Sequence, residues 1–164
     1  MDAVIESAWL SSNFPGQSEC GDCLLVQPIP AGVLIAVADG LGHGGKAAES
    51  CKTAIDEVRR ACENHILLIE IVQRCDQALR NKRGAAIAFC ILDRQAGSLT
   101  WLGIGNVEGR LLSADDEGAV SRQMLLMQAG VVGYKLPELR PATLPIRRDD
   151  LLILATDGIR PEFS

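Results

Sequence analysis

The feature that most constrains the fold is an uninterrupted apolar run at residues 32–38, GVLIAVA, which ends at Asp39 and Gly40. A strand that is apolar at every position, and not only at every second one, is typical of a sheet covered on both faces. Because an Asp-Gly pair ends the run, the carboxylate of Asp39 is carried to the edge of that sheet. The sequence therefore predicts a buried central strand that delivers an acid to a glycine-rich turn.

Helices and strands are expected to be segregated along the chain. Apolar residues recur at helical spacing from Lys46 to Cys62, and a second amphipathic helix is expected near residues 65–81. Short apolar runs separated by turn residues follow, and the first three predict an antiparallel meander. These runs are residues 85–93, 98–106, 109–114, 123–127 and 149–158. Because helices and parallel strands do not alternate, the order favours an α+β fold over a doubly wound one.

The length and charge of the chain limit its number of domains, its location and its partners. A chain of 164 residues fits a single domain, residues 1–164. No apolar run reaches the roughly 18 residues of a membrane span, and the first ten residues carry acids where a secretory signal has basic residues. We therefore expect a cytoplasmic protein without a membrane partner. The net charge of -5 argues against nucleic acid as a partner, because phosphate backbones require clustered Lys and Arg.

Most of the six cysteines are expected to be structural. Four of them fall on apolar helix faces or inside an apolar strand, as buried free thiols do. These four are Cys51, Cys62, Cys75 and Cys90. Cys20 and Cys23 form a CGDC segment, which is compatible with a redox pair or with half of a zinc site. No second CxxC or His pair completes a zinc site.

The glycine-rich turn GLGHGGK, residues 40–46, matches the GxxxxGK signature of a phosphate-binding loop. It also lies between a strand and a helix, as that motif requires. The residue after the lysine should then be Ser or Thr, whose hydroxyl binds magnesium. Here it is Ala47, which offers no side-chain oxygen. A P-loop-like nucleotide-binding protein is therefore only the third interpretation.

Three acids point to a different chemistry. They are Asp22 in CGDCLL, Asp39 in AVADG and Asp157 in LATDG. The last two end an apolar strand just before a glycine, where a carboxylate is exposed and a backbone carbonyl can approach an ion. Oxygen ligands suit Mg²⁺ and Mn²⁺, and two such ions about 3.5–4 Å apart activate water for in-line attack on phosphorus. Taken singly, such Asp-Gly pairs are ordinary turns, so spacing alone does not establish a metal site.

Five segments, taken in order, resemble the SpoIIE-type branch of the PPM metal-dependent Ser/Thr protein phosphatases. They are AVADGLGHG, RGAAIAFCILD, GIGNVEGRL, GVVGYKLPELRP and DDLLILATDGI, and the likeness runs from about residue 20 to the last residue. The resemblance implies a PPM-type α-β-β-α sandwich, with two antiparallel sheets flanked by helix pairs. It also implies two Mn²⁺ or Mg²⁺ ions at one edge and hydrolysis of phosphoserine or phosphothreonine. Members of this branch that reset bacterial stressosomes act on phosphorylated STAS-domain proteins, which makes such a protein the implied substrate and partner.

The resemblance assigns roles to individual residues. Asp22 matches the first metal acid of the family, and Asp39 matches the acid that bridges the two ions and so serves catalysis. Gly40 matches the residue that gives a backbone carbonyl to the metals, and Asp157 matches the acid on the second core strand. His43 is offset from the histidine of the wider class, so we expect a turn histidine at the mouth of the site and not a general acid.

The sequence departs from the family at its end. The family's last acid, in a DDxT-like motif on a final strand, has no counterpart because the sequence stops at PEFS. We therefore expect the C-terminal family segment to be absent and at least one ion to bind more weakly. This departure supports the alternative of a catalytically impaired phosphatase fold that acts as a regulatory or binding module. GVVGYKLPELRP, residues 130–141, is either a docking element for the partner or a plain connecting loop.

Overall fold

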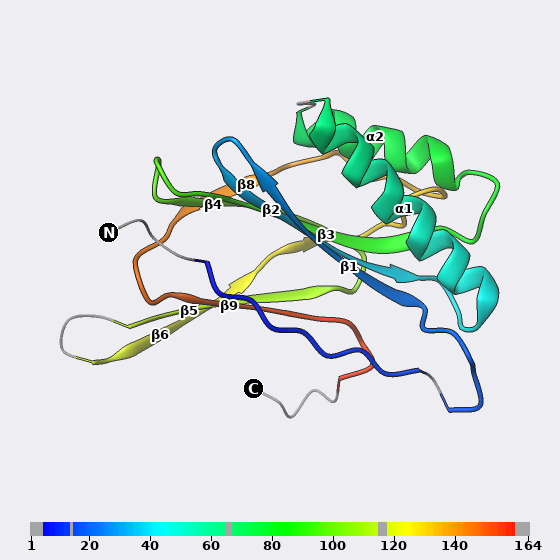
Figure 1. Ribbon diagram of the computed structural model, residues 1–164, viewed down its shortest axis with the longest axis horizontal. Helices are drawn as coiled ribbons and strands as arrows, with labels where there is room; N and C mark the ends of the chain where they lie inside the picture. The colour runs from blue at the N-terminus through cyan, green and yellow to red at the C-terminus, as the bar shows by residue number, and fades with distance from the viewer. Residues whose placement is uncertain (1–4, 14, 65–66, 115–117, 160–164) are drawn as a thin grey trace.

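The computed structural model describes residues 5–13, 15–64, 67–114 and 118–159. Figure 1 shows a pair of helices, a larger sheet beneath them and a smaller sheet below it. The helices are α1 (Gly45–Glu63) and α2 (Leu68–Leu79). The strands are β1 (Asp22–Ile29), β2 (Gly32–Gly40), β3 (Ala85–Asp93), β4 (Ser98–Ile104), β5 (Glu108–Ala114), β6 (Val120–Leu125), β7 (Met127–Gln128), β8 (Ala142–Pro145) and β9 (Leu151–Ala155).

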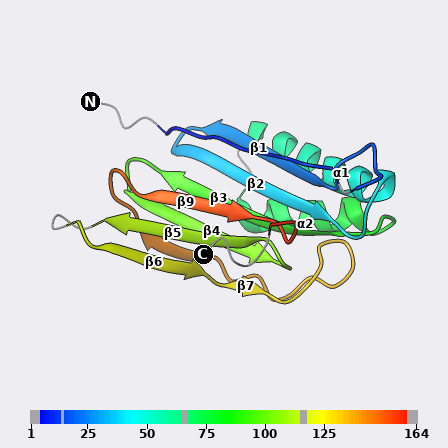
Figure 2. The ribbon, with the colours of Figure 1, turned by 90° about the horizontal axis from the view of Figure 1, so that it is seen from below.

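The strands form two sheets that face one another (Figure 2). The larger sheet has the order β1-β2-β3-β4-β7, and β8 also pairs with β4; the smaller sheet has the order β6-β5-β9. Neighbouring strands are antiparallel except for the short parallel pair of β4 with β7. The α+β class predicted from the element order is thereby confirmed.

The apolar run of β2 is explained by burial on both faces. Leu34, Ala36 and Ala38 pack into the hydrophobic cluster formed with the helices. Ile35 and Val37, which point to the opposite face, pack against the cluster between the two sheets. The strand pairs with β1 on one side and β3 on the other, so the predicted buried central strand is confirmed.

Both helices cover the same face of the larger sheet (Figure 1). The two predicted helices are confirmed, and the second begins at Leu68, while residues 65–66 of its expected start lie outside the described residues. In the described part of the chain no second helix pair covers the smaller sheet. None of the described helices is long and apolar enough to span a lipid bilayer.

The predicted three-stranded meander is wrong at its third strand. β3 and β4 pair antiparallel as expected, but β5 leaves the larger sheet and pairs with β6 and β9. The chain turns at Gly105, whose φ is 94°, and a Cβ on this residue would lie 2.5 Å from the Cβ of Ala86. Only glycine combines this left-handed backbone with so close a contact, so the turn redirects the chain into the second sheet.

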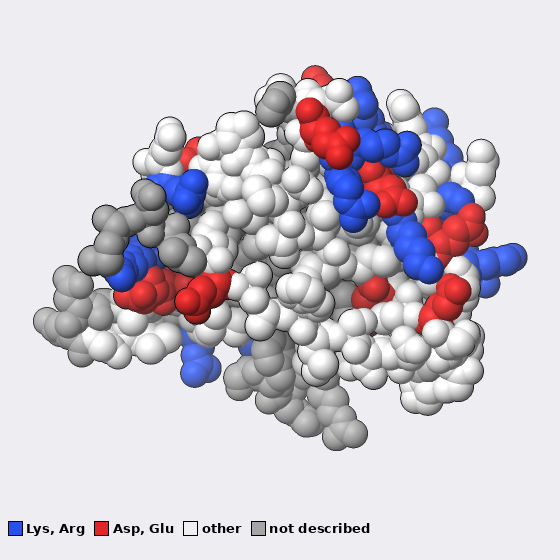
Figure 3. All heavy atoms as spheres, in the orientation of Figure 1, with Lys and Arg blue, Asp and Glu red and all other residues white. Residues whose placement is uncertain are grey.

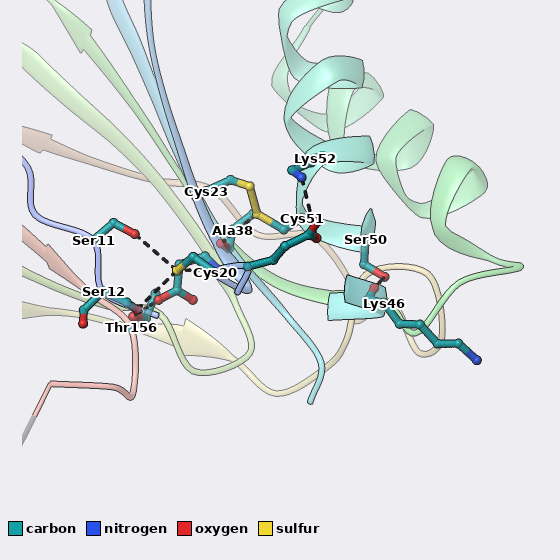
Figure 4. Close-up of a disulfide and its surroundings, with 12 residues drawn as sticks. Ser11, Ser12, Cys20, Cys23, Ala38, Lys46, Ser50, Cys51, Lys52 and Thr156 are labelled. Atoms are coloured by element: carbon teal, nitrogen blue, oxygen red, sulfur yellow. Dashed lines mark hydrogen bonds and ion pairs between the residues drawn. A yellow bond between two sulfur atoms is a disulfide. The ribbon is translucent and has the colours of Figure 1, made fainter. Parts of the chain in front are cut away.

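One pair of cysteines differs from the prediction of buried free thiols. Cys23 on β1 forms a disulfide with Cys51 on α1, with a Cα–Cα distance of 5.8 Å (Figure 4). The prediction of a free thiol at Cys51 is therefore wrong, because Cys23 faces the helix layer. The other three buried thiols, Cys62, Cys75 and Cys90, are free as predicted. Cys20 is also free, so the CGDC segment does not form a disulfide of its own.

A buried acid fixes the loop that precedes β8. Asp76 on α2 is 8% exposed, and its Oδ1 accepts a hydrogen bond of 2.8 Å from the backbone N–H of Gly133. Its Oδ2 lies 3.3 Å from the guanidinium of Arg80. The backbone N–H groups of Ala85 and Val132 each donate to the other residue's carbonyl at 3.0 Å. Residues 130–136 are thus joined to the end of α2 and the start of β3.

We expect Asp76→Ala to lower the free energy of unfolding by about 2–3 kcal/mol, because the Gly133 N–H would be left buried without an acceptor. Urea unfolding followed by circular dichroism measures this loss. The matched control is Asp56→Ala on α1, whose exposed carboxylate pairs with Arg59 at 2.8 Å. Its expected loss is about 0.5 kcal/mol or less. Equal losses in the two variants would contradict the anchoring role of Asp76.

Candidate functional site

Two of the predicted acids are direct neighbours across two strands. The antiparallel register of β1 and β2 places Asp22 opposite Asp39. Directly opposite residues point to the same face, with Cβ atoms typically about 4.5–5.5 Å apart. Val37, two residues before Asp39, packs into the cluster between the sheets, so both acids lie on the face toward the smaller sheet. The backbone N–H of Gly40 donates to the carbonyl of Gly21 at 3.0 Å and holds the two strand ends together.

The end of β9 brings the third acid to this edge. Thr156 follows β9 directly, and its hydroxyl donates a hydrogen bond of 2.9 Å to Oδ2 of Asp22. Asp157 is the next residue, and its Oδ2 accepts a hydrogen bond of 2.7 Å from Nδ2 of Asn106. Cys20 also contacts Asp22, since its sulfur accepts the Asp22 N–H at 3.4 Å. Segments from both sheets therefore meet around Asp22 and Asp39.

The electrostatics of this edge are unfavourable for carboxylates. Burial raises the pKa of Asp39 to about 7, and the negative charges of Asp22 and Asp157 add to the rise. A hydrogen bond from Asn106 acts in the opposite direction. Burial also raises the pKa of Asp22, although the Thr156 hydroxyl counteracts it. Among the described residues none of the three acids takes part in a salt bridge, so their negative charge is uncompensated.

The glycine turn begins with a very close backbone contact. A Cβ on Gly40 would lie 2.0 Å from the carbonyl oxygen of Ala47, in the first turn of α1. No other residue fits there without moving the helix. His43 lies exposed in the same turn, and its role at the mouth of a site stays a prediction. The turn is therefore a tight connection between the strand that bears Asp39 and the helix.

The P-loop interpretation does not hold in this structure. A P-loop connects a strand of a βαβ unit to a helix, and its lysine reaches the phosphates. Here β2 pairs antiparallel with both of its neighbours, and α1 is followed by α2 and not by a parallel strand. Lys46 extends outward from the start of α1, on the side away from the disulfide (Figure 4).

The donor chemistry of the edge suits a hard cation, since carboxylate oxygens are the ligands that Mg²⁺ and Mn²⁺ prefer. A positive ion would also relieve the repulsion that raises the pKa of Asp39. In the described residues no three or more His, Cys, Asp or Glu side chains are placed so that they could by themselves hold a metal ion. An ion here would need backbone oxygens or water to complete its coordination, as Mg²⁺ commonly does.

The sequence prediction missed two polar residues of this edge. Asn106 follows β4 in the GIGN turn, and Thr156 precedes Asp157 in the LATDG segment. Both are polar residues just after the end of a strand, and this position was the only feature of the sequence that could have indicated a role in the site. Which acid each would contact depends on the packing of the two sheets.

Known proteins are similar to this chain in sequence and in fold. The model of the Stage II sporulation protein E (SpoIIE) family matches residues 30–160. The phosphoserine phosphatase RsbX of Bacillus subtilis (strain 168) is 30% identical over 147 residues, which is 90% of this chain and 71% of that protein. A crystal structure of RsbX in complex with magnesium has a TM-score of 0.80 and 28% identity, over 92% of this chain and 73% of that chain.

Two further structures extend the comparison. A structure from work on the bacterial stressosome as a modular system has a TM-score of 0.82 and 31% identity, over 93% of this chain and 76% of that chain. The PPM Ser-Thr phosphatase MsPP of Mycobacterium smegmatis has a TM-score of 0.70 at 17% identity, over 95% of this chain and 79% of that chain. The PPM-type fold implied by the sequence is thus confirmed.

We expect Asp39→Asn to stabilise the metal-free protein above pH 7. A carboxyl whose pKa rises on folding favours the native state below its unfolded value of 3.8 and loses that effect as the pH rises through about 7. After allowance for solvent screening, the gain at pH 8 should be about 1–2 kcal/mol. Urea unfolding in EDTA from pH 5 to 8 measures it. The control Asp149→Asn changes an 88% exposed side chain and should leave the pH profile unaltered. A variant at Asp39 that follows the wild-type profile would contradict the prediction.

We expect Asn106→Ala to weaken Mn²⁺ binding about tenfold, because the amide orients Oδ2 of Asp157 and such outer contacts are worth about 10–100-fold in affinity. Isothermal titration calorimetry with Mn²⁺ measures the change. Asn64→Ala is the matched control, since Asn64 donates to the carbonyl of Arg60 at the end of α1. If both variants bind Mn²⁺ as the wild type does, Asn106 has no such role.

Proposed function

The chain belongs to the SpoIIE family, and on that premise we propose that it is a divalent-metal-dependent phosphatase of phosphoserine or phosphothreonine in a protein. The observation that carries the proposal is the half-buried pair of carboxylates at Asp22 and Asp39, with Asp157 nearby and no cationic partner among the described residues. The likeness to the phosphoserine phosphatase RsbX supports the same reaction.

The proposed metal ligands are the carboxylates of Asp22, Asp39 and Asp157 and the backbone carbonyl of Gly40. Bound Mn²⁺ or Mg²⁺ would supply Lewis acidity, which lowers the pKa of water and offsets the charge of a phosphoryl group. We propose that the site would take two ions and that Asp39 would contribute ligand oxygen to it. The magnesium in the related RsbX crystal structure supports dependence on a divalent ion.

The remaining residues of the edge would position these ligands. Thr156 holds one oxygen of Asp22 by its hydroxyl, and Asn106 holds one oxygen of Asp157 by its amide. The raised pKa of Asp39 means that its proton must leave before a cation binds, so ion binding is favoured as the pH rises toward and above 7. No cysteine nucleophile is required, because water attacks phosphorus directly in this type of hydrolysis.

For the substrate we propose a phosphorylated STAS-domain protein of the stressosome type. The 30% identity to RsbX and the 31% identity to a structure from work on the bacterial stressosome support this choice. Tyr134, in the loop of residues 130–141, is 86% exposed. The backbone N–H of the preceding residue, Gly133, donates a hydrogen bond to Asp76. A loop that is fixed at its base and aromatic at its tip suits a docking role for residues 130–141.

The second candidate is a non-catalytic module that binds the same partner. It is favoured by the incomplete set of metal-binding side chains among the described residues. Turnover separates the two functions, because a binding module needs neither an ion nor a proton-free Asp39.

The decisive assay is Mn²⁺-dependent release of phosphate from a phosphoserine STAS domain. We expect turnover by the wild type and a loss of at least about 100-fold in Asp39→Ala, because metal ligands act in the rate-limiting hydrolysis. The exposed-site control Asp56→Ala should stay within about twofold of the wild type. Full activity of Asp39→Ala would overturn the metal assignment. If neither the wild type nor the variants release phosphate, but the chain still binds the STAS domain, the non-catalytic module is the correct function.

A further inference from the structure

A small pocket lies beside the glycine turn, where the start of α1 meets the segment between α2 and β3. Its volume is about 210 Å³. Its lining residues are Lys46, Glu49, Asn81, Lys82 and Arg83. In the space-filling view Lys and Arg atoms protrude at the end of the molecule where α1 begins, on the right, with acidic atoms beside them (Figure 3).

The pocket and the candidate metal edge share the glycine turn. The guanidinium of Arg83 packs on Gly42, because a Cβ on that glycine would lie only 2.5 Å from Nη1 of Arg83. The backbone N–H of Leu41 donates to the carbonyl of Gly84 at 3.1 Å, which fixes the turn against the same segment. Asp39 immediately precedes this turn, so the pocket and the acid edge are connected through the turn.

The charge of the pocket is positive in a chain whose net charge is -5. Three of its charged side chains are cationic, and the single acid, Glu49, forms an ion pair with Lys82. The hydrogen bond from Lys82 lowers the pKa of Glu49, and the charge of Lys46 adds a smaller effect in the same direction. Within the described ranges neither Lys46 nor Arg83 forms an ion pair, so two positive charges are left without a direct counter-ion.

We propose that this cationic pocket, formed by Lys46, Asn81, Lys82 and Arg83, binds acidic side chains next to the phosphoserine of the protein substrate. The inference rests on the proposed phosphatase function and names the substrate class: phosphoproteins whose modified serine has Asp or Glu neighbours. Arg and Lys donate strong charge-assisted hydrogen bonds to carboxylates. The volume suits a side chain and is below the roughly 300–1,000 Å³ of typical small-molecule sites.

A binding experiment tests the pocket without relying on turnover. Fluorescence anisotropy in Mn²⁺ is measured with labelled peptides that carry a non-hydrolysable phosphonate in place of phosphoserine. The peptides differ only in their flanks, which hold Asp and Glu, Asn and Gln, or Lys. We expect the wild type to bind the acidic peptide about tenfold more tightly than the neutral one at low salt. The preference should shrink toward 1 M salt, where the Debye length falls from about 10 Å to about 3 Å.

Charge reversal sharpens the test. Arg83→Glu should lose the preference for acidic flanks and bind the Lys-flanked peptide better than the wild type does. Lys46→Glu is a second, independent variant that should shift the preference the same way, and thermal melts check that each variant is folded. The matched control is Arg59→Glu, whose parent side chain pairs with Asp56. It lies 13 residues beyond Lys46 on α1, roughly 20 Å along the helix axis, and should keep the wild-type preference.

The outcomes separate this inference from the proposed function. Equal affinity of the wild type for acidic and neutral peptides, or equal effects of Arg83→Glu and Arg59→Glu, would overturn the pocket. Mn²⁺-dependent hydrolysis of p-nitrophenyl phosphate, which has no flanking residues, is measured in parallel. Hydrolysis without peptide preference overturns the pocket alone, whereas preference without hydrolysis supports the pocket and overturns the phosphatase.

Discussion

The pairing of β1 with β2 is the constraint on which the candidate site depends, because it sets Asp22 opposite Asp39 on one face. Like charges directly opposite each other on a sheet are destabilising, and partial burial increases the cost. The arrangement persists because β2 is held between two hydrophobic layers, so its position is not decided at the site. Hydrophobic packing of β2 thus stabilises the fold, whereas the repulsion between the two acids at its end destabilises it. Such local destabilisation is typical of functional sites.

The two sheets contribute differently to the site. The larger sheet supplies the acid pair, and the smaller sheet supplies Thr156 and Asp157 at the end of β9. Their relative position depends on the cluster between the sheets, where Trp101 is buried and its Nε1 donates to the carbonyl of Leu126 at 2.8 Å. Residues of this cluster, which are far from the acids, therefore set the distances between the acids of the two sheets. A substitution in the cluster would change those distances.

Local pattern was sufficient for much of the fold. The apolar run of β2, the two amphipathic helices and the β3–β4 hairpin follow from periodicity and turn residues, and Asp39 from its place at a strand end. Sequence alone could not show that Gly105 sends β5 to the other sheet, or that Cys23 faces Cys51. It also missed Asn106 and Thr156, because a strand end is visible in the sequence whereas the meeting of two sheet edges is a product of tertiary packing.

The loop that carries Tyr134 has a dynamic consequence. Its backbone is hydrogen-bonded to Asp76 on α2 and to Ala85 on β3. The short segment between these two elements supplies three lining residues of the cationic pocket, Asn81, Lys82 and Arg83. Local opening of a protein occurs in cooperative units of contiguous structure. Opening of the loop would therefore break hydrogen bonds to both elements that bound the pocket segment. A partner that contacts one of these surfaces would rigidify the other, so recognition by the two would be thermodynamically coupled.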